Sequence, residues 1–97
     1  MSEPDLRLSA VRALLGQIPP SLRAVSVDTD AEKVYFRCIF DGTESDHDRE
    51  LLSEAAALVI ADFPSPRIMD EQYQTVKPPG EMRHLRHMVF LRHEAPK

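Results

Sequence analysis

The sequence predicts an α+β fold, a two-layer sandwich in which a four-stranded antiparallel sheet carries two helices on one face. Apolar residues recur at helical spacing in two segments, and four other segments are rich in alternating, β-branched or aromatic residues. These segments follow each other in the order α-β-β-α-β-β, with links between strands short enough for hairpins. Hairpins with both helices on one side give a two-layer arrangement.

Length and composition indicate one soluble domain spanning residues 1–97. The chain has 97 residues, of which 42% are hydrophobic, enough for one small core. No run approaches the roughly 20 apolar residues of a membrane span, and no secretory signal pattern precedes the first helix. We therefore expect a cytoplasmic protein without membrane contact. The single cysteine, Cys38, lies in a strand pattern and is expected to be a buried apolar residue.

The first helix is expected over about residues 3–16. Ser2 is a candidate N-cap with Pro4 in the first turn, while Gly16 and the following prolines end the helix. One apolar face should point inward, formed by Leu8, Val11, Leu14, Leu15 and Ile18.

A hairpin follows, with strands over residues 22–28 and 33–41 joined by a polar turn. Alternation along the second strand places one set of side chains toward the helices: Val34, Phe36, Cys38 and Phe40. The opposite set should line the outer face: Tyr35, Arg37 and Ile39.

The second helix should begin after Ser45, which forms a near capping box with Asp48, and end near Asp62, before Phe63 and Pro64. Its core side is predicted to consist of Leu51, Leu52, Ala55, Leu58 and Val59.

Two further strands are expected over residues 67–76 and 84–93. If both helices cover one face of the sheet, the other face would expose apolar and aromatic side chains. The expected members are Tyr35, Ile39 and Tyr73, with either Met88 and Phe90 or Leu85 and Leu91, depending on register. Such a patch is a candidate interface, including one for a homodimer.

Charge is divided unevenly along the chain. Residues 1–66 carry 12 acidic and 6 basic residues, whereas residues 67–97 carry 4 acidic and 6 basic residues. An acidic first part disfavours nucleic-acid binding, which depends on clustered Lys and Arg, and favours a basic protein partner. The candidate partner-binding acids have only Arg49 nearby in the sequence to balance them, and they are Asp41, Glu44, Asp46, Glu50 and Glu54.

Asp62 is a separate candidate. It lies at the end of a helix, where the helix dipole disfavours an acid, and it should therefore have a partner. We expect it either to accept hydrogen bonds from the backbone or from an arginine of the sheet, or to contact another protein.

No pattern in the sequence indicates an enzyme, a cofactor or a metal site. The three glycines are isolated, and no phosphate-binding loop is present. His84 and His87 would point to opposite faces of a strand, while His87 and His93 would lie about 20 Å apart. The acidic loop around Gly42 does not have the spacing of an EF-hand calcium loop.

Several residues together resemble a known family. They are Phe40, Asp41, Gly42, Ser45, Asp48, Glu50, Ser53, Glu54, Ala55, then Ile60, Ala61, Asp62, Phe63 and Pro64, and finally Leu91, Arg92 and Glu94. This set resembles small bacterial immunity proteins encoded beside polymorphic or contact-dependent growth inhibition toxins. The segment from Arg86 to Met88 departs from that pattern because it contains no tryptophan. The resemblance implies a non-enzymatic α+β protein that binds and blocks a toxic nuclease domain, without assigning the binding residues.

Three functions therefore remain open. The chain could be an immunity protein that neutralises a basic toxin domain, expected to be a nuclease, through its acidic surface. It could be a homodimeric structural or regulatory protein associating through Tyr35 and Tyr73 on the sheet face. Third, it could be a small enzyme working through His84, His87 or His93.

Overall fold

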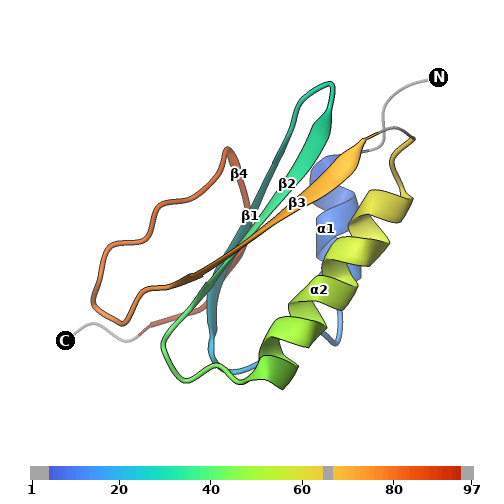
Figure 1. The fold of residues 1–97 in the computed structure, drawn as a ribbon. Helices are drawn as coiled ribbons and strands as arrows, with labels where there is room; N and C mark the ends of the chain where they lie inside the picture. Colours follow the sequence, from blue (N-terminus) through green and yellow to red (C-terminus); the bar gives the residue numbers. More distant parts are fainter. Residues whose placement is uncertain (1–4, 65–66, 95–97) are drawn as a thin grey trace.

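The fold contains two helices and a four-stranded sheet in the predicted chain order (Figure 1). The computed structural model describes residues 5–64 and 67–94. The elements are α1 (Leu6–Leu14), β1 (Leu22–Thr29), β2 (Lys33–Phe40), α2 (Asp46–Ala61), β3 (Ile68–Thr75) and β4 (His87–Leu91). The α+β class and the order α-β-β-α-β-β are confirmed.

The ends of α1 and β4 differ from the prediction. The proposed cap at Ser2 and Pro4 lies outside the described residues, and the helix is capped by Asp5, whose Oδ1 accepts a hydrogen bond from the Leu8 amide at 3.2 Å. β4 has five residues, so His84 and His93 both lie outside it.

The sheet is mixed, so the prediction of a purely antiparallel sheet was wrong. The strand order is β3-β2-β1-β4, in which β1 pairs antiparallel with both β2 and β4. β2 and β3 pair in parallel, with Cys38 opposite Tyr73. The cause is α2, whose 16 residues return the chain to the end of the sheet where β2 began, so that β3 runs in the same direction.

The segment between β3 and β4 covers part of the outer sheet face. These two strands lie at opposite edges, and the segment joining them runs on the side of the sheet away from the helices (Figure 1). The Leu85 amide donates to Ser26 Oγ at 2.8 Å, and Arg37 Nη1 donates to the Arg83 carbonyl at 3.0 Å. Ile39 is consequently buried, not exposed as the alternation predicted.

The core lies between the sheet and the helices. α1 contacts β1 and β4, α2 contacts β2 and β3, and the helices contact each other. The largest fully buried side chains of this layer are Leu22, Val25, Val27, Val34, Phe36, Cys38, Phe40, Leu52 and Val59. The predicted inward face of β2 is confirmed by its four members in this list.

Tyr73 lies on the core side of β3, so its predicted position on the outer face was wrong. Parallel pairing puts it beside Cys38, and its half-buried ring packs against the core, with its centroid 6.4 Å from that of Phe40. Residues opposite each other on adjacent strands point to the same face of a sheet, and pairing with the buried Cys38 therefore places Tyr73 on the core side.

Five positions on or next to the helices that were predicted to be core are exposed: Leu8, Val11, Leu15, Ile18 and Leu58. Leu58 is more than half exposed, because α2 buries Leu52, Ala55, Ala56 and Val59 instead. On α1 the buried residues are Leu6, Ser9, Ala10, Ala13 and Leu14. Of the residues that were predicted to form the inward face of this helix, only Leu14 belongs to this set.

Candidate functional site

The N-terminus of α2 is held by one of its own acids, Asp48, together with Ser45. The predicted capping box is present: Ser45 Oγ accepts from the Asp48 amide at 3.1 Å, and Asp48 Oδ2 accepts from the Ser45 amide at 3.2 Å. Ser21 Oγ also donates to Asp48 at 2.8 Å, and this hydrogen bond is the main cause of a lowered pKa of Asp48. α2 is thereby fixed to the segment that leads into β1.

Asp41 is paired within the protein, which the sequence did not indicate. Arg92 Nη1 donates to Asp41 Oδ2 at 2.8 Å, and Thr43 donates to the other oxygen. The Arg92 hydrogen bond, followed by that of Thr43, lowers the pKa of Asp41 to about 2. The prediction that only Arg49 could balance this acid was wrong, because Arg92 is remote in sequence.

Glu44 is also engaged, and its side chain is largely buried. It accepts hydrogen bonds from the Gly42 amide at 2.9 Å and from the Thr75 hydroxyl, and Arg49 Nη2 lies 3.6 Å from Oε2. Burial raises the pKa of Glu44, but the hydrogen bonds from Thr75 and from backbone amides outweigh it, so that the pKa is lowered overall. Glu44 therefore joins the start of α2 to the end of β3.

Asp62 has an internal partner, as expected, although the partner is neither backbone nor a sheet arginine. It is the C-cap residue of α2, and Ser9 Oγ of α1 donates to its Oδ2 at 2.6 Å. The hydrogen bond links the two helices and satisfies an acid that the dipole of α2 disfavours.

Both candidate tyrosines donate their hydroxyl groups to nearby acids. The Tyr35 hydroxyl donates to Asp30 at 2.7 Å, which raises the pKa of Tyr35 to about 12. The Tyr73 hydroxyl donates to Glu71, and burial, more than this bond, raises the pKa of Tyr73. With Tyr73 on the core side, the two tyrosines do not form one patch on the outer sheet face.

Three of the predicted acids that are exposed form a column along α2. Asp46, Glu50 and Glu54 are spaced four residues apart, so they lie on one side of the helix, opposite its buried side. Glu54 accepts a hydrogen bond from Gln17 Nε2 at 3.0 Å. Glu50 and Glu54 also line an open hollow of about 340 Å³ together with the small residues Ser53 and Ala57. We call Asp46, Glu50 and Glu54 the acidic column.

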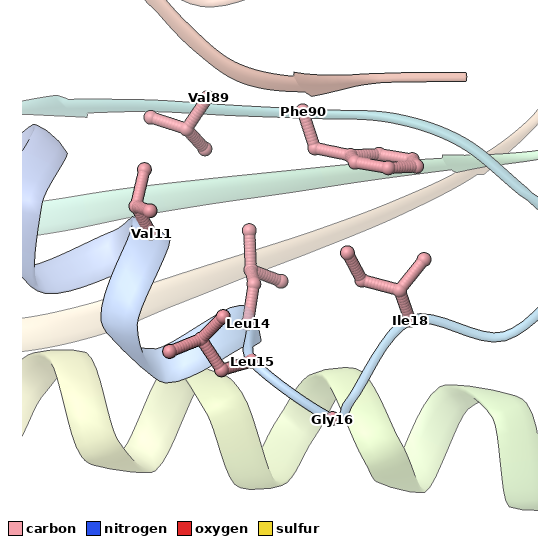
Figure 2. A pocket seen from close by; sticks show the side chains of 7 residues that line it. All are labelled: Val11, Leu14, Leu15, Gly16, Ile18, Val89 and Phe90. Carbon is pink, nitrogen blue, oxygen red and sulfur yellow. The ribbon is translucent and has the colours of Figure 1, made fainter. Parts of the chain in front are cut away.

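A second surface was missed because its residues were predicted to be core. Leu8 and Val11 are each 46% exposed, Leu15 is 76% exposed and Ile18 is 43% exposed. Beside them lies a hollow of about 270 Å³ whose other lining residues are Leu14 and Gly16, with Val89 and Phe90 of β4 (Figure 2). We call Leu8, Val11, Leu15 and Ile18 the apolar stripe.

The sequence matches the family model of the MafI2 immunity protein over residues 3–94, which includes every helix and strand described above. The chain belongs to the MafI2 immunity protein family. A search of curated proteins gave no match. The resemblance to small bacterial immunity proteins is thus confirmed. Membership in the MafI2 family gives the chain a general role, which is neutralising a cognate toxin, and immunity proteins are generally not enzymes.

For a MafI2 immunity protein, the sites that matter are those available to another protein. In the part of the chain that the structure describes, no three metal-ligating side chains come together, and no helix is long and apolar enough to cross a membrane. The acidic column, in which Glu54 is also hydrogen-bonded to Gln17, and the apolar stripe are the candidate binding surfaces, whereas Asp41, Glu44 and Asp62 link elements of the fold.

Proposed function

We propose that this MafI2 family member neutralises its toxin by binding a basic region of the toxin domain through the acidic column, and that the toxin is a nuclease. The observation that carries the proposal is the exposure of Asp46, Glu50 and Glu54 along one side of a firmly capped helix. A nuclease holds phosphate groups with Lys and Arg, so its active site offers the complementary charge.

The like-charge pairs within this column oppose the stability of α2. Like charges spaced four residues apart on a helix cost about 0.2–0.5 kcal/mol per pair, and the column contains two such pairs. Asp46 lies in the first turn of α2, where an acid is favoured by the helix dipole, but Glu50 and Glu54 lie beyond that turn. Glu50 takes part in both like-charge pairs and lies beyond the first turn, so helix stability does not account for it, and its exposure is consistent with selection for a basic partner.

The acidic column also has the geometry needed for electrostatic steering. Its three carboxylates stand on a rigid element, because α2 is capped at Ser45 and is fastened to α1 through Asp62. A fixed field of this kind raises the rate of association with a basic partner, and exposed charges are screened over about 10 Å at 0.1 M salt.

The test uses this chain and a catalytically inactive form of the toxin domain encoded beside it. Association and dissociation rates are measured between 50 and 500 mM salt for the wild type and for Glu50→Lys/Glu54→Lys. We expect the double variant to associate at least about tenfold more slowly at low salt, with the difference shrinking as salt rises. With active toxin, excess wild-type protein should stop cleavage of nucleic acid.

A matched control distinguishes the effect of the acidic column on association from the effect of net charge alone. Glu32→Lys/Glu81→Lys makes the same change in net charge at two exposed positions outside α2. We expect this control to slow association much less. Equal slowing by both double variants would show that net charge, and not the acidic column, governs association. A toxin that cleaves no nucleic acid would overturn the proposal that the toxin is a nuclease.

A further inference from the structure

α1 has apolar side chains on two sides, although it packs on the sheet by only one of them. Its inner side is built from small residues and leucines, among them Ala10 and Ala13, which are buried. Its outer side carries Leu8, Val11 and Leu15, and Leu15 is the most exposed large apolar residue of the described chain, at 76%. α1 and its C-cap leave Leu8, Val11 and Leu15 exposed beside Arg7 and Arg12, and a group of exposed apolar residues bordered by polar ones is typical of an interaction surface.

Leu8, Val11 and Leu15 are spaced three and four residues apart, so they lie along one side of α1 up to its C-cap, and Ile18 lines the same hollow as Val11 and Leu15. Figure 2 shows Val11, Leu14 and Ile18 on one side of the adjoining hollow, with Val89 and Phe90 of β4 on the other. A volume of about 270 Å³ between apolar walls can accept a large apolar side chain from outside.

The acidic column lies next to this apolar surface. Gln17, between Leu15 and Ile18 in the chain, donates its side-chain amide to Glu54 at 3.0 Å, so the segment that carries one end of the stripe is hydrogen-bonded to the column. Along the groove between the helices, Arg12 and Asp62 lie beside Leu8 and Leu58. An apolar centre bordered by charged groups is the usual composition of a protein–protein interface.

We propose that the apolar stripe and its hollow form the centre of the toxin-binding surface, and that the toxin inserts an apolar side chain there which is flanked by Lys or Arg on the α2 side. This inference rests on the proposed function, because it names the part of the toxin that the acidic column would attract. Charge complementarity selects this occupant over a second copy of the chain. Each copy carries a net charge of −4, and like charges brought together at an interface oppose binding.

The two surfaces then have separable roles. Fully desolvated apolar contacts near the centre of an interface dominate the dissociation rate, whereas exposed charges at its border act mainly on the association rate and its salt dependence. The stripe should therefore determine how long the complex lasts, and the column how fast it forms.

The experiment measures both rates for Leu15→Ser and Val11→Ser/Leu15→Ser against the inactive toxin domain. Ile68→Ser is the matched control, because Ile68 is also an exposed aliphatic residue, at 58%, but lies on β3 at the far edge of the sheet. We expect at least about tenfold faster dissociation for the single variant and more for the double variant, with association and its salt dependence nearly unchanged. The control should stay within about twofold of wild type.

The outcomes separate the inference from the function on which it rests. Wild-type protein that does not bind the toxin would overturn the proposed function and this occupant with it. Tight wild-type binding that Leu15→Ser and the double variant leave unchanged would overturn only the inference. Sedimentation of the free chain tests the remaining alternative, which is that the stripe binds a second copy of the chain. A wild-type dimer that Leu15→Ser dissociates, together with unaltered toxin binding, would assign the stripe to a second copy of the chain. Circular dichroism and thermal unfolding establish that each variant is folded.

Discussion

Arg23 and Glu94 form a two-bond ion pair that holds the C-terminal end of the described chain against β1. Arg23 Nε donates to Glu94 Oε2 and Nη2 donates to Oε1, both at 2.7 Å. The remaining nitrogen, Nη1, donates to the carbonyl oxygens of Val76 and Gly80, at 2.7 and 3.2 Å. This buried guanidinium therefore anchors the chain at two places, after β3 through Val76 and Gly80 and after β4 through Glu94.

Acid should weaken the fold through this network. Hydrogen bonds from Arg23 lower the pKa of Glu94 to about 2, and those from Arg92 lower the pKa of Asp41 to about 2, against ordinary values of 4.5 and 3.8. Because both pKa values are depressed in the folded state, the stabilisation is complete above about pH 5 and is lost as the pH falls toward 2. Denaturant unfolding between pH 7 and pH 2 measures this loss.

Glu94→Gln identifies the source of the acid sensitivity. It should lower stability at pH 7, because Arg23 loses a charged acceptor, and it should flatten the fall in stability below pH 5. Glu32→Gln removes the same charge from an exposed position outside this network and outside the acidic column, and it should leave the fall in stability below pH 5 in place. Parallel profiles for wild type and Glu94→Gln would contradict the assignment.

Two leucines on α2 should differ sharply in their contribution to stability. Leu52 is fully buried and Leu58 is more than half exposed, although the same helical pattern predicted both as core. Leu52→Ala should lower the free energy of unfolding by about 2–5 kcal/mol, because it leaves a cavity. Leu58→Ala should change it by less than about 1 kcal/mol. Chemical denaturation compares the two directly, and a similar loss in both variants would contradict the packing of α2.

The thiol of Cys38 should report on unfolding. It is fully buried on β2, and burial raises its pKa, so little thiolate is available for reaction. We expect a thiol reagent at pH 8 to leave the native protein unmodified and to label one group in guanidinium chloride. Leu52→Ala should speed labelling in buffer, since its unfolded population is larger. Rapid labelling of native wild type would contradict the burial of Cys38.

Much of the fold could be predicted because its signals are local. Ser45 and Asp48 lie three residues apart, and their capping box follows from that spacing alone. The β1–β2 hairpin likewise joins two adjacent apolar segments. The direction of β3 could not be obtained this way, because it depends on where α2 returns the chain. The burial of Ile39 depends on a segment more than 40 residues away that crosses the sheet.

The candidate site was harder to predict, because it depends on which residues the fold leaves without partners. Asp41 and Asp46 look alike in the sequence, yet one is bound by Arg92 and the other is exposed. The stripe was missed for a related reason. A helix with apolar residues on both sides has two possible inner faces. In this protein the side that carries the small residues Ala10 and Ala13 packs against the core.

Glu50→Lys should stabilise the free protein while it weakens toxin binding. Glu50 lies four residues from both Asp46 and Glu54, so the substitution turns two repulsive pairs into two attractive ones, worth about 1 kcal/mol in total at low salt. The same change places a positive charge in the centre of the acidic column and should slow association with the toxin domain.

Thermal unfolding in 20 mM and 1 M salt measures the first effect, which should largely vanish at the higher concentration because salt screens exposed charges. Glu81→Lys, which adds the same charge in the segment between β3 and β4, should change neither stability nor association appreciably. If Glu50→Lys instead destabilised the free protein, the result would indicate that the acids stabilise the fold. A stabilised variant that still associated at the wild-type rate would indicate that the toxin binds at a surface other than the acidic column. Greater stability together with slower association is the combination expected of acids retained for a partner at the expense of their own helix.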